Sequence, residues 1–175
     1  MMNINQFFKK HEEILLSLLT YLAIIVAVTL AFELWPRYNP VPSELRGQVN
    51  FKVAYPKSGL EKGSFNYQPN PGFLTFKASS GSNQLIITEQ SLPAGISANS
   101  SDSTALLNHL GVHYYDQVKT KLGIASIAKF WTGDYTPAGQ TGILAVKNTL
   151  VLVHPQKQLS SDDWVKLFNN MKVTK

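Results

Sequence analysis

One apolar run constrains this chain more than any other stretch. Residues 14–32, ILLSLLTYLAIIVAVTLAF, contain no charged residue over nineteen positions. At about 1.5 Å per helical residue, the run covers nearly the ~30 Å hydrocarbon core of a bilayer. Trp35 and Tyr38 follow it, and both residue types favour the headgroup zone. We therefore expect a transmembrane helix over residues 14–35.

A cleaved signal peptide is the alternative, because residues 29–31 (TLA) place small residues where a peptidase would cut. However, the run is longer than the ~7–15 apolar residues of a signal-peptide core, which favours a retained signal-anchor. Lysines and arginines are nearly balanced on its two sides. Because the leading segment is short and the following one is rich in Ser, Thr and Asn, we expect residues 1–13 to be a cytoplasmic tail and the rest to be extracytoplasmic.

The remainder of the chain divides into a stalk and one domain. Prolines at 36, 40 and 42 oppose a helix and favour extended geometry, which predicts a Pro-rich stalk over residues 36–46. Residues 47–175 are enough for a single α+β domain with its own core. The chain has no cysteine, so neither disulfides nor thiolate metal sites are expected. Its net charge of +5 suits a partner such as anionic lipid, but no arginine-rich run indicates nucleic acid.

Hydrophobic periodicity predicts the elements of this domain. We expect an antiparallel sheet of five or six strands with two helices packed on one face, and a glycine-rich loop over residues 133–142. The strands are predicted around residues 49–55, 73–78, 84–90, 124–132, 143–146 and 150–153. The second and third of these are expected to form one hairpin, and the last two a second hairpin.

The two helices are predicted from their caps and apolar stripes. The first is expected between residues 101–103 and Gly123, with Gly111 interrupting it, and the second begins at Ser160 or Ser161. The predicted buried residues are Val49, Phe51, Ile87, Leu107, Leu110, Tyr114, Leu144, Val146, Val151, Trp164, Leu167 and Phe168.

Three sequence segments are similar to those of a known class of proteins: VAYPKSGLEKG, ITEQSLP, and AVKNTLVLVHP followed by LSSDDWVKLFNNM. With them the chain resembles bacterial single-pass membrane proteins that have a small extracytoplasmic α+β domain. The ending, a hairpin and then a helix with an acidic first turn, is also similar to lipoprotein-carrier-like domains on some bacterial anti-sigma regulators. The resemblance implies a membrane location and this layout, but it transfers no catalytic residue.

His109, His113 and Asp116 form the sharpest constellation. On one helix they would cluster beside the apolar stripe, and two imidazoles with a carboxylate can bind zinc. The chain lacks an HExxH motif, and an exposed polar flank is the better explanation of the three residues. We expect no metal and no other cofactor.

The sequence offers two other candidate sites. Trp131, Tyr135 and Gly139 could border a ligand cleft formed with the glycine-rich loop. Glu61 and Glu89 could form an acid–base pair only if the fold brings them together.

Within the apolar run, Ala23, Ala27 and Ala31 recur every four residues, a spacing that allows two helices to pack closely as a homodimer.

These observations favour a membrane-anchored, extracytoplasmic binding or protein-interaction module in the cell membrane. Its expected partners are the lipid bilayer and an envelope protein or small amphiphile, bound by residues 131–142 or by an open sheet face. A regulatory sensor subunit of an envelope complex is the first alternative. An envelope hydrolase is the second alternative. It is ranked last because the sequence contains no catalytic triad, metal motif or phosphate loop.

Overall fold

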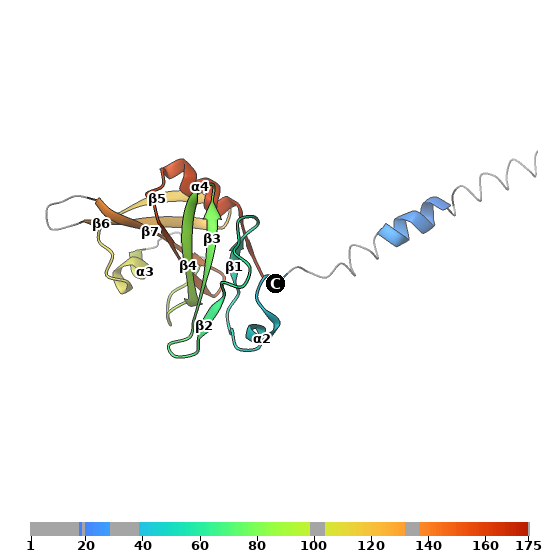
Figure 1. Cartoon of the computed structure of the whole chain (residues 1–175), viewed down its shortest axis with the longest axis horizontal. Helices are drawn as coiled ribbons and strands as arrows, with labels where there is room; N and C mark the ends of the chain where they lie inside the picture. Colours follow the sequence, from blue (N-terminus) through green and yellow to red (C-terminus); the bar gives the residue numbers. More distant parts are fainter. Residues whose placement is uncertain (1–17, 19, 29–38, 99–103, 132–136, 175) are drawn as a thin grey trace, which may run out of the picture. The chain divides into compact units, whose positions relative to one another are not determined.

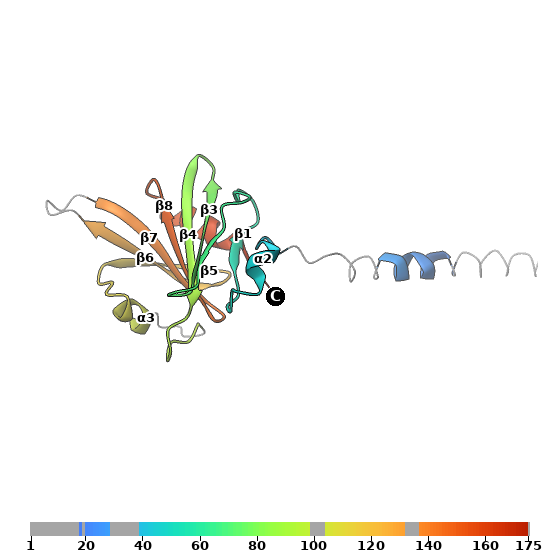
Figure 2. The same cartoon turned by 60° about the horizontal axis from the view of Figure 1, so that its bottom comes forward.

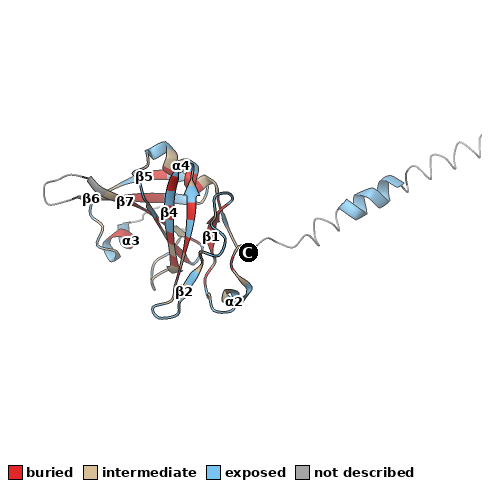
Figure 3. Cartoon of the chain, in the orientation of Figure 1, coloured by how far each residue is buried: buried red, intermediate tan, exposed pale blue. Residues whose placement is uncertain are grey.

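The computed structural model describes residues 18, 20–28, 39–98, 104–131 and 137–174, with the backbone alone at 130, 131, 137 and 138. The chain forms two units, Met1–Tyr38 and Asn39–Lys175. In the first unit, residues 20–28 are helical and every one of them is exposed (Figure 3). Among the described residues, no helix is both long enough and apolar enough to cross a membrane. Residues 14–17, 19 and 29–35 of the expected span lie outside the described part.

A seven-stranded antiparallel sheet forms the second unit, which confirms the α+β class with one more strand than the expected maximum. Its strands fan out side by side in Figures 1 and 2. In spatial order they are β2 (Asn66–Gln68), β3 (Phe73–Ser80), β4 (Asn83–Ser91), β8 (Thr149–Pro155), β7 (Pro137–Val146), β6 (Gly123–Trp131) and β5 (Tyr115–Thr120). The hairpins β3–β4 and β7–β8 confirm the two hairpins that the sequence predicted.

A second, two-stranded sheet pairs β1 (Ala54–Pro56) with β9 (Met171–Val173). The prediction of a strand over residues 49–55 was therefore correct only at its end. Phe51 and Val53 belong to the alternating apolar residues that predicted the strand. Both are buried in the core, but neither lies in a strand. Strand pairing with β9 begins at Ala54, which lies opposite Val173. The short helix α2 (Ser43–Arg46) precedes this segment and replaces part of the expected stalk.

Two hydrophobic clusters lie on opposite faces of the large sheet. Helix α4 (Ser161–Asn169) places Trp164 and Phe168 in the cluster that contains Leu144, Val151 and Val153. Helix α3 (Thr104–His109) places its leucines against Ala128, Ile143 and Leu150. Since neighbouring residues of a strand point to opposite faces, the two helices cover different faces. The expectation of both helices on one face was wrong.

The start of α4 agrees with the sequence prediction. Ser160 is the N-cap, and its hydroxyl accepts a hydrogen bond from the backbone N–H of Asp163 at 3.2 Å. The same hydroxyl donates to the Asp163 carboxylate at 2.7 Å. This bond and the one from Lys166 lower the pKa of Asp163. The bond from the Asp163 N–H to the serine hydroxyl is the N-cap bond expected of a serine followed three residues later by an acidic residue.

The helix predicted up to Gly123 ends much earlier. Gly111 has φ +68°, and the backbone N–H of Val112 donates to the carbonyl of Leu107 at 2.9 Å. This is the Schellman type of helix end, in which a glycine adopts the left-handed conformation just after the last turn. The prediction that a glycine ends this helix is confirmed, but the glycine is Gly111 and not Gly123. Residues beyond Gly111 instead form β5, whose Val118 is buried opposite Ala125 on β6.

Most residues predicted to be buried are buried, and Tyr114 is the clear error. It is 72% exposed because it lies in the link between α3 and β5, not on a helix face. Leu110 and Val49 are only half-buried. Part of the predicted loop is also strand, since β7 begins at Pro137. Residues 132–136 lie outside the described part.

Candidate functional site

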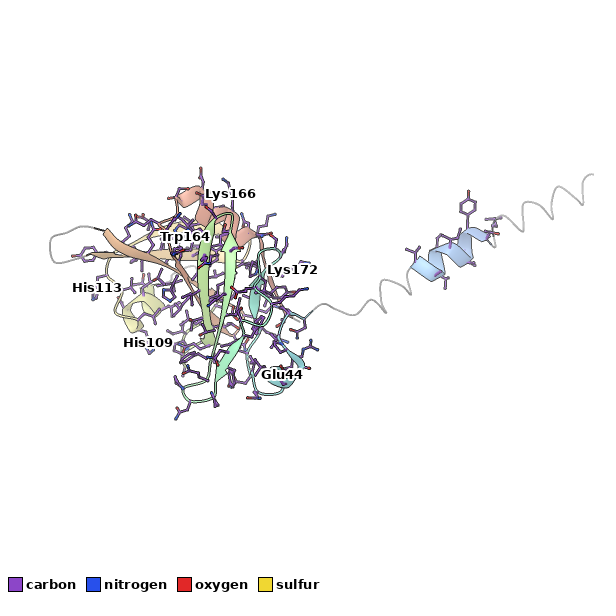
Figure 4. All side chains as sticks on the ribbon, in the orientation of Figure 1. Glu44, His109, His113, Trp164, Lys166 and Lys172 are labelled. Atoms are coloured by element: carbon purple, nitrogen blue, oxygen red, sulfur yellow. The ribbon has the colours of Figure 1, made fainter. Side chains whose placement is uncertain are left out.

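The structure separates the three residues of the possible zinc site. His109 ends α3, His113 lies in the following link, and Asp116 belongs to β5. Figure 4 shows both histidines on the α3 side of the domain, away from Trp164. Asp116 forms an ion pair with Lys129 at 2.6 Å. Within the described residues, no group of three or more His, Asp or Glu side chains could hold a metal ion.

The predicted ligand cleft falls largely outside the described structure. Tyr135 is not described, and Trp131 is described only by its backbone, which pairs with Pro137. Gly139 is half-buried opposite Phe130 on β6. In the apolar segment, Ala23 and Ala27 lie on the exposed helix, whereas Ala31 is outside the described residues. The cleft and the helix dimer therefore stay predictions.

Glu89 is fully buried near the C-terminal end of β4. Its two carboxylate oxygens accept hydrogen bonds from one backbone N–H, that of Ala54, at 3.0 and 3.2 Å. Burial raises the pKa of Glu89 well above its ordinary value, and the hydrogen bond from Ala54 opposes this only in part. The carboxyl group therefore ties β1 to the large sheet and favours its neutral form.

Glu61 does not share a cleft with Glu89. It is exposed, and its backbone N–H donates to the carbonyl of Lys77 at the edge of β3. One carboxyl group is in solvent and the other is inside the core, so the two do not form an acid–base pair.

The face of the sheet that carries α3 is open over strands β4 and β8. His154 pairs with Ile86, which is 48% exposed. The imidazole Nδ1 of His154 lies 2.9 Å from the hydroxyl of Thr141. Partial burial lowers the pKa of His154, so the neutral ring is favoured. This open face is the second binding region that the sequence suggested.

A basic hollow of about 200 Å³ lies where residues 39–53 meet the end of the chain. Figure 1 shows α2, β1 and the C-terminus together on that side of the domain. Arg46 and Lys52 supply two positive charges to its lining, and Asn39 and Thr174 supply polar groups. Val41 and Phe51 also line it, but both are almost completely buried. The chemistry of this lining suits a small polar anion.

Backbone hydrogen bonds fix the walls of the basic hollow. Arg46 donates through Nε to the carbonyl of Val41 at 2.8 Å and through Nη2 to that of Asn39 at 3.2 Å. The backbone N–H of Lys52 donates to Asn148 at 3.2 Å, and the carbonyl of Lys52 accepts from the hydroxyl of Thr149. These bonds attach the lining to the β7–β8 turn, so the hollow is formed before any ligand binds.

The opposite wall is fixed to the C-terminal segment in the same way. The backbone N–H of Val53 donates to the hydroxyl of Thr174 at 3.0 Å. The backbone N–H of Thr174 donates in return to the carbonyl of Val53 at 2.8 Å. Residues more than 120 positions apart therefore line one hollow, which no local sequence pattern could reveal.

Comparison of this chain with protein-family models, with characterised proteins and with solved structures found no match.

Proposed function

We propose that this protein is a membrane-anchored binding module. Its apolar N-terminal segment spans the cell membrane once, and its α+β domain binds a ligand or partner on the extracytoplasmic side. The candidate partners are a component of the bilayer, an envelope protein or a small amphiphile. This arrangement is that of the bacterial single-pass proteins that the sequence resembles.

One observation carries the proposal: the described part of the apolar segment is a helix with apolar side chains on every side. Leu18, Leu22, Ile24, Ile25, Val26 and Val28 are each between 49% and 62% exposed. Moving one such side chain out of water is worth about 1.5–3 kcal/mol. A helix that is apolar on every side belongs inside a large core or a membrane. The uncharged run of nineteen residues favours the membrane.

The test is membrane extraction of the full chain with and without charges in the segment. We expect the native chain to resist carbonate extraction. Replacement of both Leu22 and Val26 by lysine should release it, because each lysine at the centre of a span costs about 2.5–3.5 kcal/mol. The matched control, Leu22→Ala with Val26→Ala, should stay in the membrane. A native chain found entirely in the soluble fraction would overturn the proposal.

Protease treatment of intact cells tests the orientation. An extracytoplasmic domain should be digested while the membrane is sealed, whereas a domain protected until the cells are broken would reverse the proposed orientation. The two experiments separate anchoring from orientation.

A further inference from the structure

Arg46 and Lys52 are cations of the basic hollow that have no carboxylate partner in the described part of the chain. The two ion pairs between described residues are Lys129–Asp116 and Lys166–Asp163. Glu44 is near Arg46 in sequence, but it does not line the hollow and its carboxylate accepts a hydrogen bond from Ser43 at 3.2 Å. The positive charge of the hollow is thus available to an external anion.

Arg46 is suited to bind a phosphate group. Its Nε and Nη2 already hold the backbone of residues 39–41, which orients the guanidinium plane. A guanidinium has five N–H donors, so Nη1 and the second hydrogen of Nη2 remain for a ligand. An arginine orientated in this way binds phosphate with defined geometry, and a nearby lysine adds a point charge.

The size of the basic hollow limits the ligand. Its volume of about 200 Å³ is below the ~300–1,000 Å³ of pockets that hold drug-sized molecules. A phosphate with a glycerol unit fits this space, and the mainly polar lining suits the hydroxyl groups of glycerol. The hollow is too small to hold acyl chains as well.

Covalent connection keeps the basic hollow near the proposed span. Six residues separate Phe32, the end of the apolar run, from Asn39 in the lining. A fully extended chain covers at most about 3.6 Å per residue, so Asn39 stays within about 25 Å of Phe32. With the run in the bilayer, phospholipid headgroups are the phosphate compounds most abundant within that reach.

We propose that the basic hollow binds the glycerol-phosphate headgroup of an anionic phospholipid. This inference rests on the proposed membrane anchoring. Arg46 and Lys52 contact the phosphate, and Asn39 and Thr174 offer hydrogen bonds to glycerol hydroxyls. Such a contact would hold the domain against the membrane surface.

The test is hydrogen exchange of the full chain in nanodiscs, with backbone amides of residues 39–53 as the readout. One nanodisc contains phosphatidylcholine alone, and the other also contains phosphatidylglycerol. With the headgroup at about ten times its dissociation constant, exchange through opening of the hollow should slow about tenfold. Lys52→Gln should lose this slowing, and Lys119→Gln, an equal charge change on β5, should keep it.

A third arm adds soluble glycerol 3-phosphate to the phosphatidylcholine nanodisc and identifies the source of the ligand. Slowing with phosphatidylglycerol that depends on Lys52 supports the proposal, whether or not the soluble compound also acts. Slowing with the soluble compound alone keeps an anion site but overturns a lipid as its ligand. No slowing in either arm, or equal slowing in Lys52→Gln, overturns the site itself.

Arg46→Lys is the second variant, because it keeps the charge and loses the guanidinium geometry. We expect it to weaken the slowing without abolishing it. Loss of membrane anchoring would appear separately, as failure of the native chain to enter nanodiscs of either composition. In that case the arm with the soluble compound still decides whether the hollow binds an anion.

Discussion

The indole ring of Trp164 lies directly against the backbone of Gly142. A β-carbon built on Gly142 would lie 2.5 Å from Cζ3 of Trp164 and 2.9 Å from Cζ of Phe168. The two aromatic rings stack on each other with centroids 5.7 Å apart. The absence of a side chain at Gly142 therefore allows α4 to reach the sheet, and this contact organises the main core.

Gly142→Ala should destabilise the domain by about 1–3 kcal/mol, the usual cost of forcing extra volume into a packed core. The loss should be measured as a lower urea midpoint. Gly139→Ala is the matched control on the same strand, because a β-carbon there would have no atom of the described side chains within 4 Å. Its effect should stay within about 0.5 kcal/mol. Equal effects of the two substitutions would contradict the packing described here.

A variant that relieves the part of the clash due to Trp164 tests the same contact from the other side. In a Trp164→Phe background, the smaller ring leaves room for the added methyl group. The cost of Gly142→Ala should then fall by about 0.5–3 kcal/mol, the range of coupling energies for residues in contact. Additive effects in a double-mutant cycle would show that the two positions are independent.

Gln140 links the start of α4 to β7. Its side-chain oxygen accepts from the indole N–H of Trp164 at 3.2 Å and from the backbone N–H of Leu159 at 2.8 Å. Gln140→Leu should cost about 1–3 kcal/mol in unfolding free energy, because two donors lose their acceptor. Gln140→Glu retains acceptor oxygens and should cost less. A similar midpoint for both variants would mean that the bonds contribute little.

The burial of Glu89 predicts that the domain loses stability as the pH rises, which is the opposite of the usual effect of a carboxyl group. Its folded pKa is raised by burial above the ordinary value of 4.5, so above that pH the folded state binds more protons than the unfolded state. Stability from this group is therefore present at low pH and falls as the pH rises toward the folded pKa. The measurement is the urea midpoint from about pH 5 to about pH 8.

Glu89→Gln should remove the fall in stability over that interval and raise the midpoint at its upper end. The amide keeps an acceptor for the N–H of Ala54 and cannot ionise. Glu61→Gln, at an exposed position, is the control and should leave the curve unchanged. An identical pH dependence in Glu89→Gln and the native protein would show that another group is responsible.

The end of α3 shows where sequence reasoning reached its limit. Gly111 and Gly123 both adopt positive φ, and either could end a helix that begins near residue 104. The apolar residues at 106, 107 and 110 fit a helix, and Val118 fits its continuation equally well. Pairing of β5 with β6 decides between them, since it buries Val118 against Ala125. That pairing is a long-range choice that helix periodicity does not encode.

Local chemistry alone determined the apolar run, the β3–β4 and β7–β8 hairpins and the serine cap of α4, because each depends on residues close together in the chain. Only the tertiary structure placed α3 and α4 on opposite faces, buried Glu89 and separated His109 from Asp116. It also brought Arg46 and Thr174 to one hollow. These features depend on which strands become neighbours, and strand pairing is set by the packing of the whole core and not by any single segment.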